Sequence, residues 1–495
     1  MHALTTSPFE SHAAAADRAV PIVVDLDGTL TPTDTLVESV LLAVKHQPAT
    51  LLLLPLWLLQ GRSAFKTRVA ERAVNLTTGD AWPYRQDLLE YLQEEKALGR
   101  RLVLATAAHR SIAEPVAAHL GLFDAVLATD SIHNLKGSAK LAAIQEQVGR
   151  DFIYAGDSSA DLPIWQASKG AILVDVSAAV KRQVKADDVP ITHEFSRAAP
   201  GMRDWLRALR VHQWLKNLLI FVPLLTAFAF TNLHSVALVV AAFVAFSLAA
   251  SATYIGNDLW DLQADRRHPR KRTRPFASGR IAIPAGLAAA AMLMLAALAL
   301  ALLLPRSFLA LLVVYVGLTS AYSWVLKSYV LIDVLMLALL YTLRIVAGGA
   351  ASGITVSLWL LGFSVFIFLS LALIKRCAEL VSMAQSGVES VKGRDYRVGD
   401  LVVLWPTGVG SGLCAVVVFA LFASAPEVAT RYATPAMLWL VAVGLIYWLA
   451  RLWIKTARGE MDDDPVVYAI RDRGSRVSIA LMLVAVLAAR YLHIG

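Results

Sequence analysis

The stretch YIGNDLWDLQADRRHPRKRTRPFASGR, residues 254–280, follows one long apolar segment and precedes another. Its residues Asn257, Asp258, Asp261 and Asp265 are spaced so that they fall on one face of a helix. Acidic side chains near a bilayer are costly without a function, so we expect this helix end to hold Mg²⁺ and, through it, a diphosphate. The simpler alternative is an ordinary cytoplasmic loop with local ion pairs, which the run of Arg and Lys alone would favour.

Apolar segments long enough to cross a membrane lie on both sides of this stretch. The predicted spans are 215–232, 235–256, 283–304, 307–326, 330–349, 357–375, 401–424, 435–453 and 476–492. Arg and Lys gather in alternate loops, which places those loops and the N-terminal part of the chain in the cytoplasm. We therefore expect an integral protein of the inner, cytoplasmic membrane with nine transmembrane helices.

The composition agrees with a membrane protein. Of the 495 residues, 57% are hydrophobic and 17% are charged, whereas soluble chains carry about a quarter charged residues. This excludes a purely soluble enzyme and a disordered chain. The net charge of +8 is too small to indicate nucleic acid, and it favours a membrane surface or phosphorylated ligands. Two cysteines, Cys377 and Cys414, predict no disulfide framework.

The N-terminal part has a different pattern. Short apolar runs alternate with helical patterns, which predicts an α/β domain with a parallel sheet; the runs are 21–26, 101–106, 124–128, 151–156 and 171–175. We expect a tail over 1–20, this domain over 21–180, a linker and lead-in helix over 181–210 and the membrane domain over 211–495. The run TLLLLPLWLL at 50–59 is too short to span and contains Pro55, so it predicts a buried or membrane-touching helix.

Carboxylates follow two of the predicted strands. Asp25 and Asp27, in VVDLDGTLT, can project from one strand end toward a single site. One carboxylate can attack phosphorus and form an aspartyl phosphate, and a second can protonate the leaving oxygen and then activate water. Asp157 and Asp161, in GDSSAD, are hard oxygen ligands that suit Mg²⁺.

Two further residues fit a phosphate site. Thr106, at the end of RLVLAT, can donate to a phosphate oxygen, and Lys136, in NLKGSAK, can neutralise phosphate charge. An Asp-x-Asp pair alone would more often be a solvated turn. Here the pair is accompanied by Thr106, Lys136 and GDSSAD, and these four elements together argue against a simple turn.

In this order, DLDGT, Thr106, Lys136 and GDSSAD resemble the haloacid dehalogenase phosphatase superfamily. The resemblance implies Asp25 as nucleophile, Asp27 as acid and base, and a helical cap over about 30–100. It also implies a Mg²⁺ site formed by Asp25, Asp27, Asp157 and Asp161. Lys140 is an alternative to Lys136.

The pattern NDxxDxxxD followed by HPRKRTRPFASG resembles the UbiA-type intramembrane prenyltransferase superfamily. It implies an all-α bundle of nine helices in which Asp258 and Asp261 hold Mg²⁺-diphosphate. The motifs HQWLKN, YSWVLKSYVLIDV and YTLRIVAGG are similar to the polyprenyl-phosphate phosphoribosyltransferase branch. The loop after the sixth span carries LIKRCAEL in place of the second Asp-rich motif of aromatic prenyltransferases.

This branch implies two substrates, a polyprenyl phosphate lipid and a diphosphate donor such as 5-phosphoribosyl 1-pyrophosphate (PRPP). The lipid phosphate attacks the anomeric carbon and pyrophosphate leaves. The expected substrate-binding residues are Lys216, Asn217, Asn257, Asp265, Arg272, Arg274, Lys327, Tyr341, Arg344, Lys375, Arg376 and Glu379. For each lone cation, extension toward the lipid headgroups is an equally good interpretation.

The fusion suggests sequential chemistry, in which the phosphatase domain removes the 5-phosphate to leave polyprenylphosphoryl ribose. Three alternatives remain at this point: prenyl transfer from a prenyl diphosphate to an aromatic or lipid acceptor, a transporter or channel with a regulatory phosphatase, and a phosphatase-like domain with a structural role. The sequence leaves a homo-oligomer open.

Overall fold

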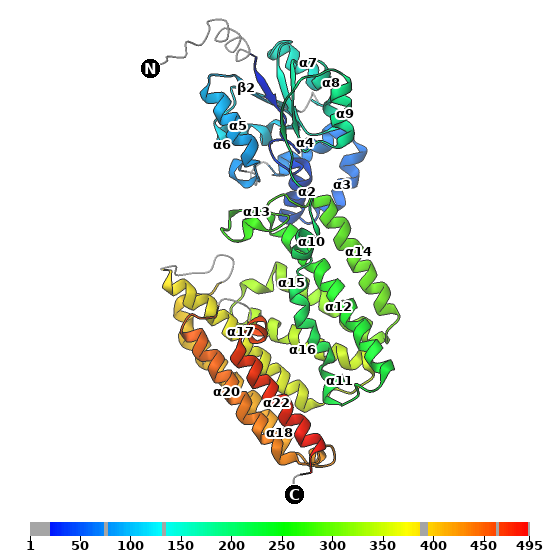
Figure 1. Ribbon diagram of the computed structural model, residues 1–495, viewed down its shortest axis with the longest axis vertical. Coiled ribbons are helices and arrows are strands. Elements are labelled where there is room, and N and C mark those ends of the chain that lie inside the picture. The colour runs from blue at the N-terminus through cyan, green and yellow to red at the C-terminus, as the bar shows by residue number, and fades with distance from the viewer. Residues whose placement is uncertain (1–19, 74–77, 131–134, 387–394, 462–464, 494–495) are drawn as a thin grey trace, which may run out of the picture. The chain divides into compact units, whose positions relative to one another are not determined.

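A computed structural model describes residues 20–73, 78–130, 135–386, 395–461 and 465–493 (Figure 1). The predicted tail before Val20 lies outside these residues. The chain forms two compact units: the N-terminal unit, Met1–Leu209 with Tyr254–Ala289, and the C-terminal unit, Arg210–Thr253 with Ala290–Gly495. The Asp-rich stretch therefore groups with the N-terminal part of the chain.

The N-terminal unit contains a six-stranded parallel sheet of order β3-β2-β1-β4-β5-β6. The strands are β1 (Ile22–Val24), β2 (Leu102–His109), β3 (Ala125–Thr129), β4 (Ile153–Gly156), β5 (Gly170–Val174) and β6 (Ile191–Phe195). The first five coincide with the predicted runs. The sixth lies in the stretch predicted as linker, so the sheet continues past residue 180.

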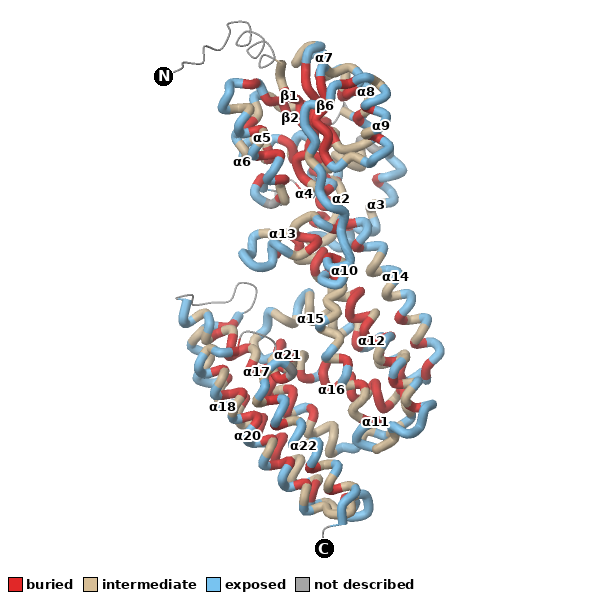
Figure 2. The backbone as a smooth tube through the Cα atoms, in the orientation of Figure 1, coloured by how far each residue is buried: buried red, intermediate tan, exposed pale blue. Residues whose placement is uncertain are grey.

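Helices cover both faces of the sheet. Ile22 and Val24 of β1 pack into one apolar core, and Val23 packs into the other, as alternation along a strand requires. The first core is closed by α5 (Gln86–Ala97) and α6 (Arg110–Leu120), and the second by α7 (Ser138–Gln147), α8 (Leu162–Gln166) and α9 (Ala178–Ala186). Strands β1 to β5 are largely buried (Figure 2), which explains their continuous apolar sequence.

Three helices are inserted between β1 and β2: α2 (Thr35–His46), α3 (Thr50–Leu59) and α4 (Arg62–Ala73). They occupy the stretch predicted as the cap, while α5 packs on the sheet. Asp34 caps the start of α2, because its carboxylate accepts hydrogen bonds from the amides of Leu36 and Val37. We call α2, α3 and α4 the cap.

Within the described residues, eight helices are long and apolar enough to cross a membrane. They are α12 (Leu233–Trp260), α14 (Ile283–Leu302), α15 (Arg306–Trp324), α16 (Ile332–Ser352), α17 (Leu358–Gln385), α18 (Leu401–Ala423), α20 (Leu438–Ala457) and α22 (Arg473–Tyr491). Their outer faces expose large apolar residues, for example Met292 and Leu295 of α14. This is expected of helices that lie in lipid.

The first of the nine predicted spans, 215–232, is not one long helix. It consists of the 3-10 helix η3 (Val211–Phe221) and the short α11 (Val222–Thr226). Pro223 lies in the first turn of α11, and Phe228 has a φ of 52°, so a regular helix cannot continue through this segment. The predicted fold class, a parallel α/β domain followed by a membrane helical bundle, is confirmed, and the exact number of crossings stays a prediction.

Close helix packing organises the C-terminal unit. Glycines bring neighbouring backbones together: a Cβ on Gly348 of α16 would lie 1.9 Å from the carbonyl oxygen of Ile220. A Cβ on Gly408 of α18 would lie 2.3 Å from the ring of Trp453 on α20. Small residues at such contacts are typical of helices packed in membranes.

Candidate functional site

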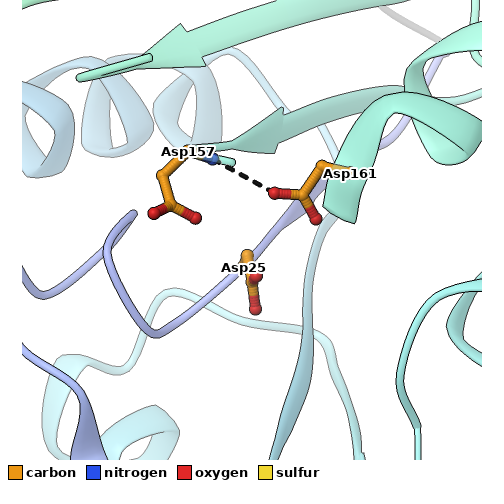
Figure 3. Close-up of side chains that lie close together, drawn as sticks. All are labelled: Asp25, Asp157 and Asp161. Atoms are coloured by element: carbon orange, nitrogen blue, oxygen red, sulfur yellow. Dashed lines mark hydrogen bonds between the residues drawn. The ribbon is translucent and has the colours of Figure 1, made fainter. Parts of the chain in front are cut away.

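Three carboxylates meet at the carboxyl ends of β1 and β4, which are parallel neighbours. Asp25 follows β1, Asp157 follows β4, and Asp161 ends the 3-10 turn η2 (Ser159–Asp161). One oxygen of each lies within 4.8 Å of the others, and Figure 3 shows the side chains around one common space. We call these three residues the strand-end cluster. The strand order reverses between β1 and β4, which is where α/β sheets bind ligands.

The backbone fixes the strand-end cluster. Asp25 Oδ1 accepts a hydrogen bond from the amide of Leu26 at 2.8 Å, and Asp161 Oδ2 accepts one from the amide of Asp157 at 3.3 Å. Gly28 has a φ of 76°, and a Cβ there would lie 2.1 Å from Asp157 Oδ2. The DLDGT sequence therefore needs glycine both for its backbone conformation and for the space that Asp157 fills.

Lys140, on α7, supplies a cation to the cluster. Its Nζ lies 2.9 Å from Asp25 Oδ2 and 3.9 Å from Asp161 Oδ1, and it donates to the hydroxyl of Tyr154 at 3.1 Å. Burial alone would lower the pKa of Lys140, but the carboxylates of Asp25 and Asp161 outweigh it and raise that pKa. The side chain therefore stays charged beside Asp25.

Asp27 is held separately, two residues beyond Asp25. Its Oδ1 accepts a hydrogen bond from the amide of Thr35, the first residue of α2, at 2.9 Å. Burial, followed by the charge of Asp34, raises the pKa of Asp27 to about 7. A carboxyl with this pKa can give and take a proton near neutral pH, as a general acid and base must.

The strand-end cluster suits a divalent cation. Burial, and then the charges of Asp161 and Asp25, raise the pKa of Asp157 to about 7. Burial likewise raises the pKa of Asp25, although Lys140 opposes the shift. Crowded oxygen ligands of this kind gain most when a hard cation such as Mg²⁺ lies between them. The residues present therefore fit the metal that the sequence predicts.

A cavity of about 420 Å³ opens beside the cluster. Its polar lining includes Asp25, Asp27, Asp157, Lys136 and Lys140. Its apolar lining includes residues 282–284, which belong to the N-terminal unit and include the first residues of α14, a candidate membrane helix. A phosphate group at the cluster would therefore share its cavity with the start of that helix.

The other two predicted phosphatase residues are placed differently. Lys136 is exposed at the rim of the cavity, while Lys140 makes the buried ion pair with Asp25. Thr106 is buried within β2, three residues before its end, and its hydroxyl accepts a hydrogen bond from the amide of Ala108. Tyr154, which sequence reasoning missed, donates to Asp161 Oδ1 at 2.9 Å. It lies inside the buried strand IYAG, where the sequence does not distinguish it from an ordinary core residue.

The stretch after α12 forms a second acidic group, which we call the helix-end cluster: Asp258, Asp265 and Arg274. One guanidinium nitrogen of Arg274, Nη1, lies 3.1 Å from Asp258 Oδ1 and 2.5 Å from Asp265 Oδ2. Both carboxylates are buried. Arg274 was predicted as a substrate ligand, and here it joins two of the predicted acidic ligands.

The helix of the Asp-rich stretch is broken once. The α12 helix ends at Trp260 and α13 (Leu262–Arg267) begins after Asp261, yet the amide of Asp265 still donates to the carbonyl of Asp261 at 2.8 Å. Asp261 and Asp265 therefore keep the helical i to i+4 hydrogen bond that the predicted spacing requires. Asn257 is half-buried and Arg272 is exposed.

An ion pair and a hydrogen bond connect this stretch to the cap inside the N-terminal unit. Arg266 makes two hydrogen bonds to Glu38 of α2, at 2.6 and 2.7 Å, and both side chains are buried. Lys45, at the end of α2, donates to the carbonyl of Trp260 at 2.6 Å. No sequence pattern indicates these contacts, because the partners are more than 200 residues apart.

Four of the predicted substrate-binding residues lie together in the C-terminal unit. Arg344, on α16, donates to Asn217 Oδ1 at 2.9 Å and to the hydroxyl of Tyr315 at 3.1 Å. Its guanidinium lies 5.5 Å from the ring centre of Tyr341, and the Nζ of Lys216 lies 5.7 Å from the same ring. Cations and an amide among apolar helices are costly, so such a group indicates a polar site.

Arg376 belongs to a different network. It is fully buried and forms ion pairs with Asp333 of α16 and with Glu379 one turn along α17. Tyr396 donates to the same Asp333. Sequence reasoning named Arg376 and Glu379 and missed Asp333 and Tyr396, which come from other parts of the chain. This pairing holds α16 and α17 together.

Two predicted cations remain. Lys375, next to Arg376 on α17, is half-buried. Lys327 is half-buried in the 3-10 turn η5 (Leu326–Ser328), between α15 and α16.

Comparisons with known proteins agree with this division of the chain. The model of the UbiA prenyltransferase family matches residues 218–489, and that of the haloacid dehalogenase-like hydrolases matches residues 22–166. An uncharacterized protein, y4nM, from Sinorhizobium fredii is 40% identical over 93% of this chain and 89% of its own length. Nodulation protein NoeC from Azorhizobium caulinodans is 35% identical, over 61% of this chain and 99% of NoeC.

A further relative carries an enzyme name. The decaprenyl-phosphate phosphoribosyltransferase of Mycobacterium tuberculosis is 34% identical over 40% of this chain and 68% of that enzyme. The resemblances predicted from the motifs are confirmed for both parts of the sequence. The chain is an integral membrane enzyme that belongs to the UbiA prenyltransferase family and carries a haloacid dehalogenase-like hydrolase domain at its N-terminus.

Proposed function

We propose that the chain transfers 5-phosphoribose from PRPP to a polyprenyl phosphate and then removes the 5-phosphate. The proposal rests on the cavity of the N-terminal unit beside the strand-end cluster. There Asp25, Asp27, Asp157 and Lys140 line the same cavity as residues 282–284, at the start of a candidate membrane helix. A phosphate ester on a lipid in the membrane is the substrate that such a cavity suits. The relatives that are phosphoribosyltransferases of decaprenyl phosphate support the first step.

In the transfer step, an oxygen of the lipid phosphate bonds to the anomeric carbon of PRPP, and the bond from that carbon to pyrophosphate breaks. The acceptor is already an anion, so the step needs no strong base. We assign Asp258 and Asp261 to hold Mg²⁺, which would stabilise charge on the departing pyrophosphate. Lys216, Arg344 and Asn217 are candidates for binding phosphate or ribose, because they already lie together.

In the hydrolytic step, Asp25 attacks phosphorus to form an aspartyl phosphate, and Asp27 gives its proton to the departing ribose oxygen. Asp27 then takes a proton from water, which cleaves the aspartyl phosphate to release inorganic phosphate. Lys140 neutralises charge beside Asp25 throughout. Asp25, Asp157 and Asp161 would hold Mg²⁺, and its charge would reduce the repulsion between the phosphate oxygens and the carboxylates.

Whether the enzyme uses PRPP or a prenyl diphosphate as its donor distinguishes this function from prenyl transfer. The purified full chain is incubated in lipid vesicles with Mg²⁺ and either PRPP plus polyprenyl phosphate or a prenyl diphosphate plus an aromatic acceptor. We expect pyrophosphate release from PRPP only when polyprenyl phosphate is present, and its loss in the double variant Asp258→Asn, Asp261→Asn. Turnover of the prenyl diphosphate without turnover of PRPP would contradict the proposal.

A further inference from the structure

The cap carries one helix, α3, that the described residues leave largely uncovered. Residues 51–59 of α3 are all apolar, and only Trp57 among them is buried. Five leucines are more than half exposed: Leu51, Leu52, Leu56, Leu58 and Leu59, the last at 85%. A helix that is apolar on nearly every side belongs in a protein core or in lipid, and the described chain supplies no core here.

The length of α3 excludes a membrane crossing. Ten residues of α-helix are about 15 Å long, about half the thickness of the hydrocarbon layer. The exposed leucines also occupy a wide arc of the helix rather than the narrow stripe that one partner helix would cover. A short helix of this kind fits the boundary between headgroups and acyl chains on one side of a bilayer.

The neighbouring helix α2 contacts the last residues of α12, a candidate membrane helix whose end belongs to the N-terminal unit. Lys45, five residues before α3, donates to the carbonyl of Trp260, the last residue of α12. Leu41 and Leu42 of α2 share a small cavity with Leu259 and Trp260. Tryptophan at the end of an apolar span marks the level of the headgroups. The α3 helix therefore starts close to a residue at that level.

The charges around α3 agree with a lipid surface. The following helix, α4, is rich in Arg and Lys, and Arg68 on it is exposed. Arg72 of α4 holds α3 in place, since its guanidinium lies 4.8 Å from the ring centre of Trp57 and donates to Thr50 at 3.0 Å. Basic residues beside an apolar helix favour anionic headgroups.

We propose that α3 is an interfacial anchor that inserts its leucine face into the lipid bilayer and holds the cap at the membrane surface. Because α2 also contributes Val37 to the cavity of the strand-end cluster, the anchor would keep that cavity close to lipid-borne phosphates. The placement of α3 itself does not depend on which phosphate the domain hydrolyses.

The test measures the surroundings of α3 in the full chain. Single cysteines replace Leu52 or Leu59 in a background in which Cys377 and Cys414 are alanine, and each carries the fluorophore NBD. Leu98 provides a matched control, because it is an exposed leucine, at 53%, just after α5 of the same domain. The protein is placed in nanodiscs with or without a doxyl-labelled phosphatidylcholine, and iodide serves as the aqueous quencher.

We expect NBD at Leu52→Cys and Leu59→Cys to emit at shorter wavelength, to be quenched at least twofold by the doxyl lipid and to resist iodide. Leu98→Cys should show the opposite pattern. Iodide quenching at Leu59→Cys as strong as at Leu98→Cys would overturn the proposal. Short-wavelength emission without quenching by the doxyl lipid would also overturn it, since another protein surface, such as a second copy, would then cover α3.

Discussion

The N-terminal unit contains two acidic clusters, each in contact with a basic side chain, and they differ in how they are held together. In the strand-end cluster, adjacent parallel strands bring Asp25 and Asp157 together, and Lys140 pairs with Asp25 beside a cavity of about 420 Å³. In the helix-end cluster, Arg274 itself joins Asp258 to Asp265. Backbone geometry assembles the first cluster, whereas a side chain assembles the second.

The largest effect should come from removing the cation of the strand-end cluster. Lys140→Met leaves Asp25 and Asp161 without their buried partner, so we expect the rate of phosphate release to fall by about 10²- to 10³-fold. Lys136→Met is the matched control, because Lys136 is exposed at the rim, and it should cost about tenfold or less. Steady-state release of phosphate from a lipid-linked substrate measures both. A larger loss in Lys136→Met would reverse the assignment.

A second change tests whether the backbone holds the same cluster. Gly28→Ala forces a Cβ against Asp157 Oδ2 at a φ of 76°, so Asp157 must move. We expect phosphate release to fall by about 10²-fold, with the transfer of phosphoribose unchanged. Gly99→Ala is the control, since Gly99 also has a positive φ but a Cβ added there would meet no atom within 4 Å. Equal losses in the two variants would indicate backbone strain alone.

The raised pKa of Asp27 predicts a pH dependence. Because its pKa is about 7 in the folded protein, Asp27 is protonated below that pH and ionised above it. The proton that it gives to the leaving oxygen is therefore lost as the pH rises. Single-turnover release of the leaving alcohol should fall about tenfold per pH unit above 7. Asp27→Asn should be slow and lack this dependence; a wild-type profile that is flat from pH 6 to 9 would contradict the assignment.

The smallest effect concerns the helix-end cluster. Arg274→Lys keeps the charge but loses the planar guanidinium that contacts two carboxylates, so we expect the transfer rate to fall about threefold to tenfold. Arg270→Lys is the same change at an exposed position nearby and should leave the rate unchanged. Pyrophosphate release measures both variants. Equal rates for Arg274→Lys and wild type would show that the cluster does not need this bridge.

The strand-end cluster was largely predictable from the sequence. Asp25 and Asp157 could be placed together because the carboxyl ends of parallel strands meet at one edge. Lys140 could not be chosen over Lys136, because that choice depends on where α7 begins after Gly137. Strand β6 was missed because its sequence, ITHEF, is polar and partly exposed at the sheet edge.

In the membrane helices, periodicity located most spans but no tertiary pairing. Asp333 pairs with Arg376, 43 residues along the chain, and no local pattern indicates such a contact. The segment 215–232 was predicted as a span because it is apolar, but Pro223 and the φ of Phe228 break its helix. The assigned roles of the site residues stay predictions.

If one chain performs both reactions, the 5-phosphate of PRPP must leave the lipid product as inorganic phosphate. The full chain in lipid vesicles receives polyprenyl phosphate and PRPP labelled in the 5-phosphate, and lipid and aqueous products are separated. Wild type should release labelled inorganic phosphate and leave unlabelled ribosyl lipid, whereas Asp25→Asn should accumulate labelled phosphoribosyl lipid. The exposed Asp151→Asn should behave as wild type. Identical labelled lipid from wild type and Asp25→Asn would contradict the claim.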